Sequence, residues 1–541
     1  MNRKYLLFFI CMLLFIGIFA VVTFDGFFFY DDMMYMQYAY DLVHGTYKVS
    51  DQLHSNRFAV FLPVAFFYSL FGVNDFSSLA WPFLSVLCTI AVLYFAFRKE
   101  DPVAGMFAIV LTGLDFYTLY FSNKLYPDDI VTPFSLLSLV LLYKYRSSPK
   151  LIYPFAFVLS ALTGFLVKTT IIYTFVFFLI VFCIDLAGKR NLRFWLVSAL
   201  SGFLIVVVYF LIYKAYTGKY LYYLDSIETG HNHSPWSYYG KPFSEILYRI
   251  TAEPFLMMLS AGYMIPILLA LPVSYGRRWK EIYDLRKRDS FWLVCGTVML
   301  LMFWFSSTSL AYYSPIPAYP RMMLLCIPVF SVAASFNLQR CLLEKKYNMI
   351  FGLLFLAAAL LSYFFADRKI SLIYLILGTV FLFFFFTWAY VVRTRFTTFF
   401  FTMLIVLLVH PLVSVFNQRS DTFFGEKKII TKNLQVGKGK ALVITDYRLA
   451  NSYVYYYRFS PPANYRFVSY PSVKKGELNS YRGTIYVIVN HNTDEYTMLY
   501  GGGYKIPDFI PAVPSGWKRI ACENKVCLYQ VADINDVVKC F

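Results

Sequence analysis

Charged residues are scarce in this chain. They make up 15% of its 541 residues, whereas hydrophobic residues make up 59% and aromatic residues 21%. Soluble globular domains carry charge on about a quarter of their residues, so this composition excludes an ordinary soluble protein. Apolar segments of about 20 residues, long enough to cross a bilayer, recur along the sequence. The composition therefore predicts a membrane protein built mainly from α-helices.

The apolar segments predict a polytopic bundle of about thirteen membrane-spanning helices. The first segment has no small-x-small cleavage site at its end, so we expect a retained span rather than a signal peptide. The fourth, fifth and thirteenth segments are short or lie close to a neighbour. The predicted spans are 5–24, 77–97, 103–121, 129–143, 151–167, 169–187, 194–213, 254–273, 291–309, 322–338, 349–365, 370–391 and 399–416.

Acidic residues are fewer than basic ones, and the formal net charge is +18. A nucleic-acid-binding protein would gather its basic residues on one surface. Here they occupy every second loop between the predicted spans, at Arg3, Lys4, Arg98, Lys99, Lys144, Arg146, Lys150, Lys189, Arg190, Arg193, Arg277, Arg278, Lys280, Arg286, Lys287, Arg288, Arg340, Lys345, Lys346, Arg393 and Arg395. The positive-inside rule makes these loops and the N-terminus cytoplasmic. We therefore expect a lipid bilayer as partner and no nucleic acid.

Two long segments fall on the predicted outer side. The first, residues 25–76, contains two apolar stretches, Asp31–Gly45 and Asn56–Leu70, which we expect to form helices in the membrane interface. The second, Lys214–Glu253, is rich in Tyr, Ser and Gly. Loops of this length are usually functional or mobile.

The C-terminal segment has ordinary polar content. Its strand-like stretches are 441–445, 465–470, 484–489 and 518–521, with a helix predicted over 449–457. We expect a small extracytoplasmic α/β domain over 417–541, after a transmembrane domain over 1–416. Cys522 and Cys527 flank a turn and can form a hairpin disulfide outside the cytoplasm, with Cys540 left over.

Two pairs of neighbouring acids are the strongest chemical signal. Asp31 and Asp32 follow the first predicted span, and Asp128 and Asp129 lie in a short loop on the same predicted side. Adjacent carboxylates at a membrane boundary repel each other and lose hydration, which raises the pKa of at least one of them. Such an acid can act as a general base toward an acceptor hydroxyl. The alternative role of both pairs is to begin or cap the helices that follow.

Four basic residues are predicted to lie on the same side of the membrane as the two acid pairs. They are Arg57, Lys124, Lys168 and Arg321. An enzyme that uses a lipid-phosphate donor needs positive charge at that boundary, and a guanidinium can bind two phosphate oxygens at once. The alternative is that each side chain reaches from the end of a span toward water.

Two further signals are weaker. Asp115 lies within the third predicted span, where it either takes part in the reaction or accepts hydrogen bonds from neighbouring tyrosines. His231 and His233 form a weak metal signal in the second outer loop, because no set of acidic partners is nearby. No metal ligand is assigned, and a requirement for a divalent metal stays open.

Five short segments carry a family resemblance. They are Tyr30-Asp31-Asp32 through Tyr35 to Gly45, Asn56-Arg57-Phe58, Leu125-Tyr126-Pro127-Asp128, Gly164–Thr169 and Pro320–Pro328. In their order and spacing they resemble the GT-C glycosyltransferases related to protein O-mannosyltransferase and aminoarabinose transferase. The resemblance covers residues 1–340 well. In the C-terminal segment it extends only to the general arrangement of the chain. Asp32 stands where the family has Glu, and Met322 where it has Tyr.

The resemblance implies an inverting transfer of one sugar from a polyprenyl-phosphate donor to a lipid, glycan or protein acceptor. It places the reaction on the outer, periplasmic face of a bacterial inner membrane. The implied residues are Asp31 or Asp32 as base, Asp128 beside the substrate, Arg57 and Arg321 on the donor phosphate, and Asp129, Lys168, Tyr35 and Lys124 around the substrate. The Trp-Trp-Asp-Tyr-Gly signature of oligosaccharyltransferases is absent, so en bloc transfer to asparagine is not expected.

A transporter or flippase of a lipid-linked sugar is the main alternative, and a non-catalytic assembly factor is the third. Transporters open to both faces of the membrane and commonly contain internal repeats. No internal repeat is visible in the sequence, and the candidate acids lie on one predicted side. These two features favour an enzyme.

Overall fold

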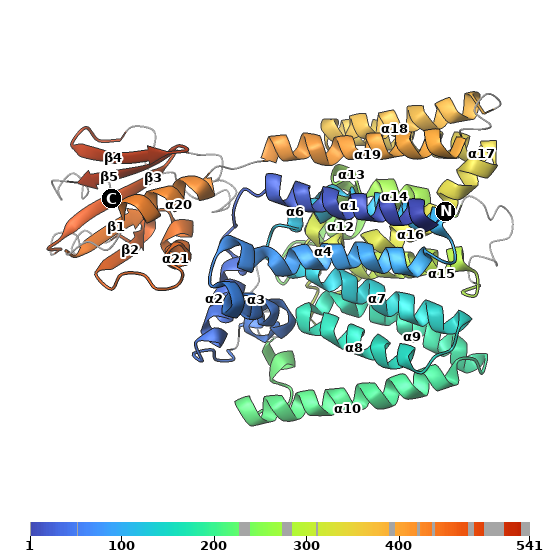
Figure 1. Cartoon of the computed structure of the whole chain (residues 1–541), viewed down its shortest axis with the longest axis horizontal. Coiled ribbons are helices and arrows are strands. Elements are labelled where there is room, and N and C mark those ends of the chain that lie inside the picture. The colour runs from blue at the N-terminus through green and yellow to red at the C-terminus, as the bar shows by residue number, and fades with distance from the viewer. Residues whose placement is uncertain are drawn as a thin grey trace. The chain divides into compact units, whose positions relative to one another are not determined.

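The fold is mainly helical, with one five-stranded sheet near the C-terminus (Figure 1). The computed structural model describes residues 2–50, 52–226, 238–272, 284–309, 312–388, 395–418, 422–434, 439–473, 481–491 and 513–531. The chain forms two compact units. Unit 1 contains Met1–Thr23, Lys48–Pro63 and Leu79–Asn417, and unit 2 contains Phe24–Tyr47, Val64–Ser78 and Gln418–Phe541.

Unit 1 is a helix bundle. Its helices are α1 (Asn2–Val22), α4 (Asp75–Phe97), α5 (Pro102–Gly113), α6 (Phe116–Phe121), α7 (Pro127–Ser147), α8 (Ile152–Val167), α9 (Ile172–Ala187), α10 (Leu192–Thr217), α12 (Phe243–Thr251), α13 (Glu253–Ser260), α14 (Met264–Ala270), α15 (Arg288–Phe305), α16 (Ile327–Leu343), α17 (Lys345–Phe365), α18 (Arg368–Phe386) and α19 (Arg395–Gln418), with the short 3₁₀ turns η1 (Leu53–Asn56), η2 (Thr169–Ile171) and η4 (Pro320–Met323). Helices α3 (Phe58–Phe71) and α4 each have residues in both units.

Eight helices of the described chain are long and apolar enough to cross a membrane, by length and composition. They are α1, α4, α9 with η2, α10, α15, α17, α18 and α19. Helices α13 and α14 meet at a bend of 103° and together make a ninth. The other predicted spans fall on α7 and on the shorter apolar helices α5, α8 and α16, so the total of about thirteen remains a prediction. The chain is an integral, multi-pass membrane protein.

The third predicted span is broken rather than continuous. Helix α5 ends at Gly113, and Asp115 begins α6 by accepting a hydrogen bond from the backbone N–H of Thr118 at 2.8 Å. Asp115 is therefore a helix cap, and this hydrogen bond comes from a backbone amide rather than from a tyrosine hydroxyl.

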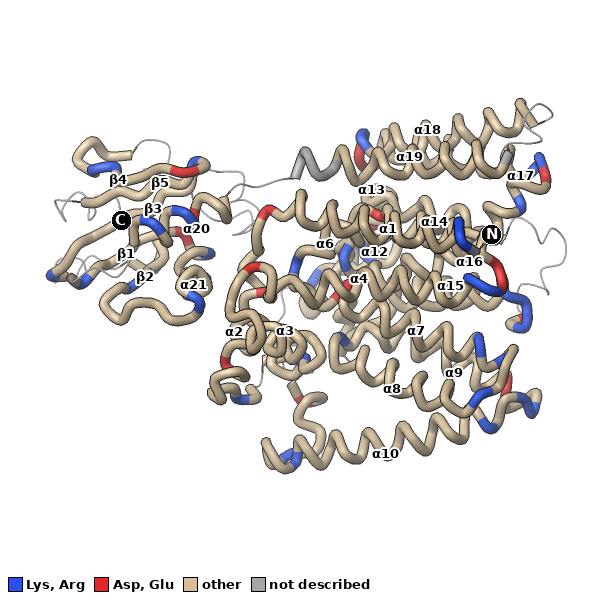
Figure 2. The backbone as a smooth tube through the Cα atoms, in the orientation of Figure 1, with Lys and Arg blue, Asp and Glu red and all other residues tan. Residues whose placement is uncertain are grey.

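Basic side chains mark one end of the bundle. Figure 2 shows many lysines and arginines of unit 1 at the end of the helices where the N-terminus lies. One of them, Arg146, pairs at 3.4 Å with the buried Asp185, which also accepts a hydrogen bond from the Trp195 indole N–H at 3.1 Å. The predicted loop residues Arg277, Arg278, Lys280 and Arg393 lie outside the described residues.

Unit 2 contains the predicted α/β tail. Its strands β1 (Ala441–Thr445), β2 (Tyr465–Ser469), β3 (Thr484–Asn490), β4 (Trp517–Glu523) and β5 (Val526–Val531) form a sheet of order β2-β1-β3-β5-β4. Helix α21 (Tyr447–Tyr456) connects the parallel strands β1 and β2, and β5 runs antiparallel to β3 and β4. The predicted strands and helix are confirmed within one to three residues at most of their ends. A disulfide joins Cys522 and Cys527 across the β4–β5 turn, as expected, and Cys540 lies outside the described residues.

Unit 2 also contains parts of the first outer loop. The predicted helix after Tyr30 is present as α2 (Asp31–Val43), and the second apolar stretch forms α3. Met33 and Met36 of α2 are buried, whereas Val43 is exposed. Helix α20 (Thr422–Asn433), which precedes the sheet, was not predicted.

The crossing of α17 and α18 generates a stability prediction. A Cβ on Gly352 would lie 2.8 Å from Leu382, and one on Gly378 would lie 3.1 Å from the carbonyl oxygen of Gly352. A methyl group at Gly202 of α10 would meet Val158 at an ordinary 3.6 Å. In a helix interior alanine stabilises the protein by about 0.5–1 kcal/mol relative to glycine, and this contribution applies at all three sites. We expect Gly352→Ala and Gly378→Ala nevertheless to destabilise the protein, because overpacking costs about 1–3 kcal/mol.

Thermal unfolding in detergent measures this difference, with Gly202→Ala as the matched control. A melting temperature that rises equally in all three variants would show that α17 and α18 are not in close backbone contact.

Candidate active site

The breaks between the helices of unit 1 bring an acid and a lysine together. Pro127 begins α7, which places Asp128 in its first turn. Lys168 has an extended backbone between α8 and η2. The Lys168 ammonium donates a hydrogen bond to Asp128 Oδ1 in a buried salt bridge, and its Nζ lies 3.0 Å from Met322 Sδ of η4. Three chain segments that are distant in sequence therefore meet at this pair.

Glycine makes the turn at Lys168 possible. A Cβ on Gly164, one turn earlier in α8, would lie 2.3 Å from Ile171 Cδ1. A larger residue would push the Ile171 side chain aside, and its Cβ would lie 3.2 Å from Cβ of Phe134 in α7. The packing gives a physical reason for glycine in this motif.

Two arginines lie within electrostatic reach of Lys168. Burial lowers the pKa of the Lys168 ammonium to about 8, with the positive charges of Arg57 and Arg321 adding to the shift and Asp128 opposing it. Arg321 of η4 lies with its guanidinium 4.3 Å from the ring centroid of Tyr126, the residue before α7. The structure thus brings Arg57, Lys168, Arg321 and Asp128 together, as we predicted.

The backbone before Arg57 is fixed by its neighbour. Asn56 of η1 accepts a hydrogen bond from the Tyr213 hydroxyl at 2.9 Å and donates one to Ser226 Oγ at 3.4 Å. Arg57 itself is buried, with an exposed fraction of 7%. We did not identify Tyr213 or Ser226 as neighbours of the site, because nothing in their local sequence distinguishes them from other polar residues at helix ends. Met322 was named only as a departure from the family motif.

The other predicted residues of unit 1 are buried beside this group. Asp129 follows Asp128 in α7 and lies within electrostatic reach of both Asp128 and Asp115. Within the described residues, Asp128 Oδ2 and Asp129 Oδ2 are buried with no hydrogen-bond partner. Lys124 is almost fully buried, with its ammonium 5.5 Å from the ring centroid of Tyr120. Buried carboxylate oxygens without a protein partner are expected where a polar ligand binds.

The acids of the first outer loop belong to unit 2. Asp32 is fully buried, and its carboxylate accepts hydrogen bonds from the backbone N–H groups of Phe28 at 2.9 Å, Tyr30 at 2.7 Å and Met33 at 3.1 Å. Burial raises the pKa of Asp32 to about 6, the neighbouring Asp31 adds to the shift, and the amide hydrogen bonds oppose it. The predicted rise of one carboxyl pKa in this pair is confirmed.

Asp31 and Asp32 have different surroundings. Asp31 is half-buried at the start of α2, whereas Asp32 and Tyr35 are fully buried. Tyr30, the N-cap residue, has no side-chain capping bond. Since these acids and the cations around Asp128 belong to different units, a common reaction centre stays a prediction.

No metal site is found in the described part of the chain, where no three His, Cys, Asp or Glu side chains converge. His231 and His233 lie outside the described residues.

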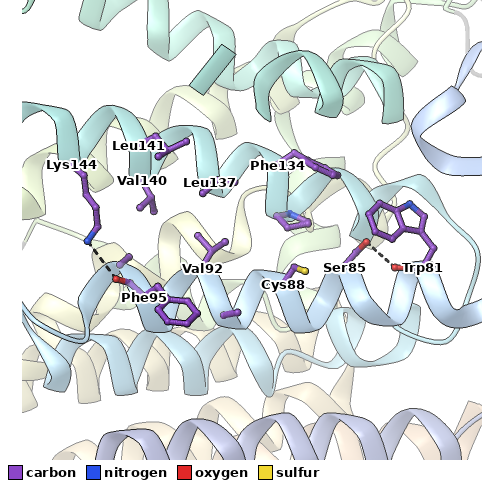
Figure 3. Close-up of a pocket in the computed structure, with 13 residues that line it drawn as sticks. Trp81, Ser85, Cys88, Val92, Phe95, Phe134, Leu137, Val140, Leu141 and Lys144 are labelled. Carbon is purple, nitrogen blue, oxygen red and sulfur yellow. Dashed lines mark hydrogen bonds between the residues drawn. The ribbon is translucent and has the colours of Figure 1, made fainter. Parts of the chain in front are cut away.

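Among the apolar cavities in the described part of unit 1, two lie beside α7 and α8. One of about 260 Å³ is lined by α8, α9, α10 and the segment after α10, including Leu162, Leu166 and Tyr223. Tyr223 lies within electrostatic reach of Arg57, so this cavity adjoins the cationic group. The other, of about 510 Å³, is a groove between α4 and α7 (Figure 3), which extends from Trp81 to Lys144.

Comparison with known proteins agrees with this description. Residues 58–220 match the family model described as dolichyl-phosphate-mannose-protein mannosyltransferase. A search of curated proteins gives no match. The matched segment begins directly after Arg57 and includes Asp128, Asp129 and Lys168, so it contains much of the site in unit 1.

The class that the fold defines is the GT-C glycosyltransferase fold. The structure is similar to crystal structures of ArnT from Cupriavidus metallidurans, in the apo state and bound to undecaprenyl phosphate, each with a TM-score of 0.56. The two alignments have 13% and 14% sequence identity and cover 98% of this chain and 99% of ArnT. The predicted fold is thereby confirmed.

The buried pair of Asp128 and Lys168 generates a prediction about stability. Removing one partner of a buried ion pair leaves an unpaired charge and costs about 3–5 kcal/mol. We expect Asp128→Asn and Lys168→Met each to lower the melting temperature, and the double variant to regain most of the loss.

Thermal unfolding of the purified wild type, the two single variants and the double variant measures this effect. Asp225→Asn is the control, because Asp225 pairs with Lys219 on the surface at 3.6 Å. Additive losses in the double variant would mean that the two side chains are not a buried pair.

Proposed function

We propose that the chain is a membrane glycosyltransferase that transfers one sugar from a polyprenyl-phosphate donor to an acceptor on a lipid, a glycan or a protein. The observation that carries this proposal is the group of three cations, Arg57, Lys168 and Arg321, around Asp128 inside an apolar helix bundle. The GT-C fold and the complex of ArnT with undecaprenyl phosphate support it.

The cations suit a donor that carries a phosphate. Two guanidinium groups can each bind two phosphate oxygens, and an ammonium adds a point charge. Asp128 pairs with Lys168, and Asp129 and Asp115 lie within electrostatic reach of each other. In a buried site the three cations favour binding of a phosphodiester and then of the phosphate monoester that leaves.

The reaction forms one bond and breaks one bond at the anomeric carbon. The acceptor oxygen or nitrogen attacks C1 of the sugar from the face opposite the phosphate, and the bond between C1 and the phosphate oxygen breaks. Polyprenyl phosphate leaves with the bonding electrons, and a carboxylate takes the acceptor proton. We assign the base to Asp31, because the Asp32 carboxylate is fully buried and already accepts three backbone hydrogen bonds.

We assign the first isoprene units of the donor to the cavity between α8 and α10. Leu166 lies two residues before Lys168, and Tyr223 lies within electrostatic reach of Arg57, so the cavity adjoins two of the phosphate ligands. The basic loops between the predicted spans support a cytoplasmic N-terminus and therefore a reaction on the outer face of a bacterial inner membrane.

An assay of the purified protein with polyprenyl-phosphate sugars tests the function. We expect release of polyprenyl phosphate by the wild type, and a fall in kcat of about 10²–10⁴ in Asp31→Asn from loss of the base. Arg57→Ala should raise the donor KM about 10-fold to 100-fold, since a hydrogen bond to a charged group contributes about 1.5–3 kcal/mol. Arg286→Ala, an exposed arginine paired with Asp284, is the control and should change neither constant.

Turnover that survives both Asp31→Asn and Asp32→Asn would end the assignment of the base to this motif. Movement of the lipid-linked sugar across vesicles without any turnover would favour the flippase instead.

Filling the two cavities separately tests the position of the lipid tail. We expect Leu162→Trp to raise the KM of a long-chain donor about 10-fold, because burial of apolar surface contributes about 25 cal/mol per Å², and to leave a short-chain analogue almost unaffected. Leu137→Trp in the α4–α7 groove is the matched control. The reverse pattern would place the tail in that groove.

A further inference from the structure

Unit 2 holds the loop before the acid pair through aromatic rings. Phe27 and Phe29, two residues of this loop, are buried, with exposed fractions of 3% and 5%. The ring centroid of Phe423 in α20 lies 5.6 Å from that of Phe27 and 5.9 Å from that of Phe29. From α21, Tyr455 lies 5.2 Å from Phe27, and Tyr456 lies 5.5 Å from Phe29. We name Phe423, Tyr455 and Tyr456 the aromatic face of α20 and α21.

The loop fits this face closely. Gly26 has a φ of +106°, which L-residues with a side chain rarely adopt. A Cβ at this position would lie 2.2 Å from the side chain of Phe423, so glycine is required for the contact as well as for the backbone. Phe29 also has a positive φ, of 58°, although it is not a glycine. A strained residue of this kind persists only where its surroundings fix it, as they do here.

The residues held by the rings alternate with the residues that hold Asp32. The backbone N–H of Phe28, between Phe27 and Phe29, donates to Asp32 Oδ2, and the N–H of Tyr30 donates to Oδ1. Movement of the two phenylalanine rings would therefore displace the two amides. Asp31 precedes Asp32 directly, so its carboxylate depends on the same loop conformation.

A buried ion pair fixes α20 against α21. Glu426 lies one turn after Phe423 and is fully buried, and its carboxylate accepts a hydrogen bond from Arg448 Nη2 at 2.6 Å and from the Tyr456 hydroxyl at 2.7 Å. Burial raises the pKa of the Tyr30 hydroxyl, and the positive charge of Arg448 opposes that shift, so Arg448 lies within electrostatic reach of the residue next to Asp31.

A second set of contacts joins the same helices to the start of α4. Asp75 pairs with Lys427 of α20 at 2.5 Å and accepts a hydrogen bond from the Tyr455 hydroxyl at 3.0 Å. Tyr455 thus contacts both Phe27 and Asp75. The first outer loop is held at two places by α20 and α21.

We propose that α20 and α21 are a positioning element for the acid motif, and that Glu426 and Arg448 keep their aromatic face in the geometry that orients the carboxylates of Asp31 and Asp32. The proposal rests on the proposed function for the role of these acids. It gives the C-terminal segment a part in the reaction through the position of the acid motif. Geometry errors of about 1 Å at a reacting group lower rates by about 100-fold, so a shift of this loop is sufficient for a measurable effect.

Three substitutions around Glu426 and one control test the proposal. Arg448→Ala removes the ion pair, Arg448→Lys retains its charge, and Tyr456→Phe removes one hydrogen bond and keeps the ring. Lys428→Ala is the matched control, since Lys428 lies on α20 two residues after Glu426 and pairs with the partly exposed Glu523 at 3.2 Å. Hydrogen exchange of the peptide that covers residues 24–33 and steady-state kinetics are measured on the same full-length preparations in detergent.

We expect faster exchange in residues 24–33 for Arg448→Ala, with kcat about tenfold lower and the donor KM changed by less than about twofold, because the variant alters orientation and not donor binding. Tyr456→Phe should show the same changes to a smaller degree, Arg448→Lys should recover part of kcat, and Lys428→Ala should match the wild type. Tyr456→Phe keeps the test valid if Arg448→Ala does not fold.

Unchanged exchange in the folded Arg448 and Tyr456 variants would overturn the proposed contact. Faster exchange with unchanged kcat would overturn the positioning role. If the wild type itself has no transferase activity, the proposed function fails, and the exchange data still decide whether α20 and α21 hold the loop.

Discussion

Charge buried in an apolar helix bundle is the constraint on which the rest of the site depends. An isolated ion in such surroundings loses several kcal/mol of hydration, so each cation must have a counter-charge or a ligand that supplies one. Asp128 supplies a direct partner for Lys168, while Arg57 and Arg321 add positive charge around the same lysine. Three cations this close together suit the phosphate donor that we propose.

The breaks in the helices follow from the same constraint. A continuous helix through Lys168 or Asp115 would hold these side chains at the lipid or at a packed helix surface. At a break, the backbone leaves the helix and the side chain can turn toward partners from other segments. Gly164, Pro127 and the cap at Asp115 are the local sequence features that produce these breaks.

The sequence predicted the helical bundle, the strands of the tail and most members of the cationic group, because apolar length, alternation and short motifs are local signals. It did not predict α20, whose sequence Thr422–Asn433 has neither a long apolar run nor a strong cap. The pairing of Lys168 with Asp128 joins residues 40 positions apart and has no local signal. The different surroundings of Asp31 and Asp32 depend on the loop before them and on α20 and α21, so two adjacent identical residues could not be told apart from sequence.

The division of unit 2 among distant chain segments has a consequence for biosynthesis. Residues 24–30 leave the ribosome early, whereas Phe423, Arg448 and Tyr455 are made almost 400 residues later, after all the spans between them. At about 5–20 residues per second, the nascent loop waits on the order of half a minute for its packing partners. The acid motif can reach the conformation described above only after α20 and α21 have been made, so a chain truncated after α19 lacks the packing partners of this motif.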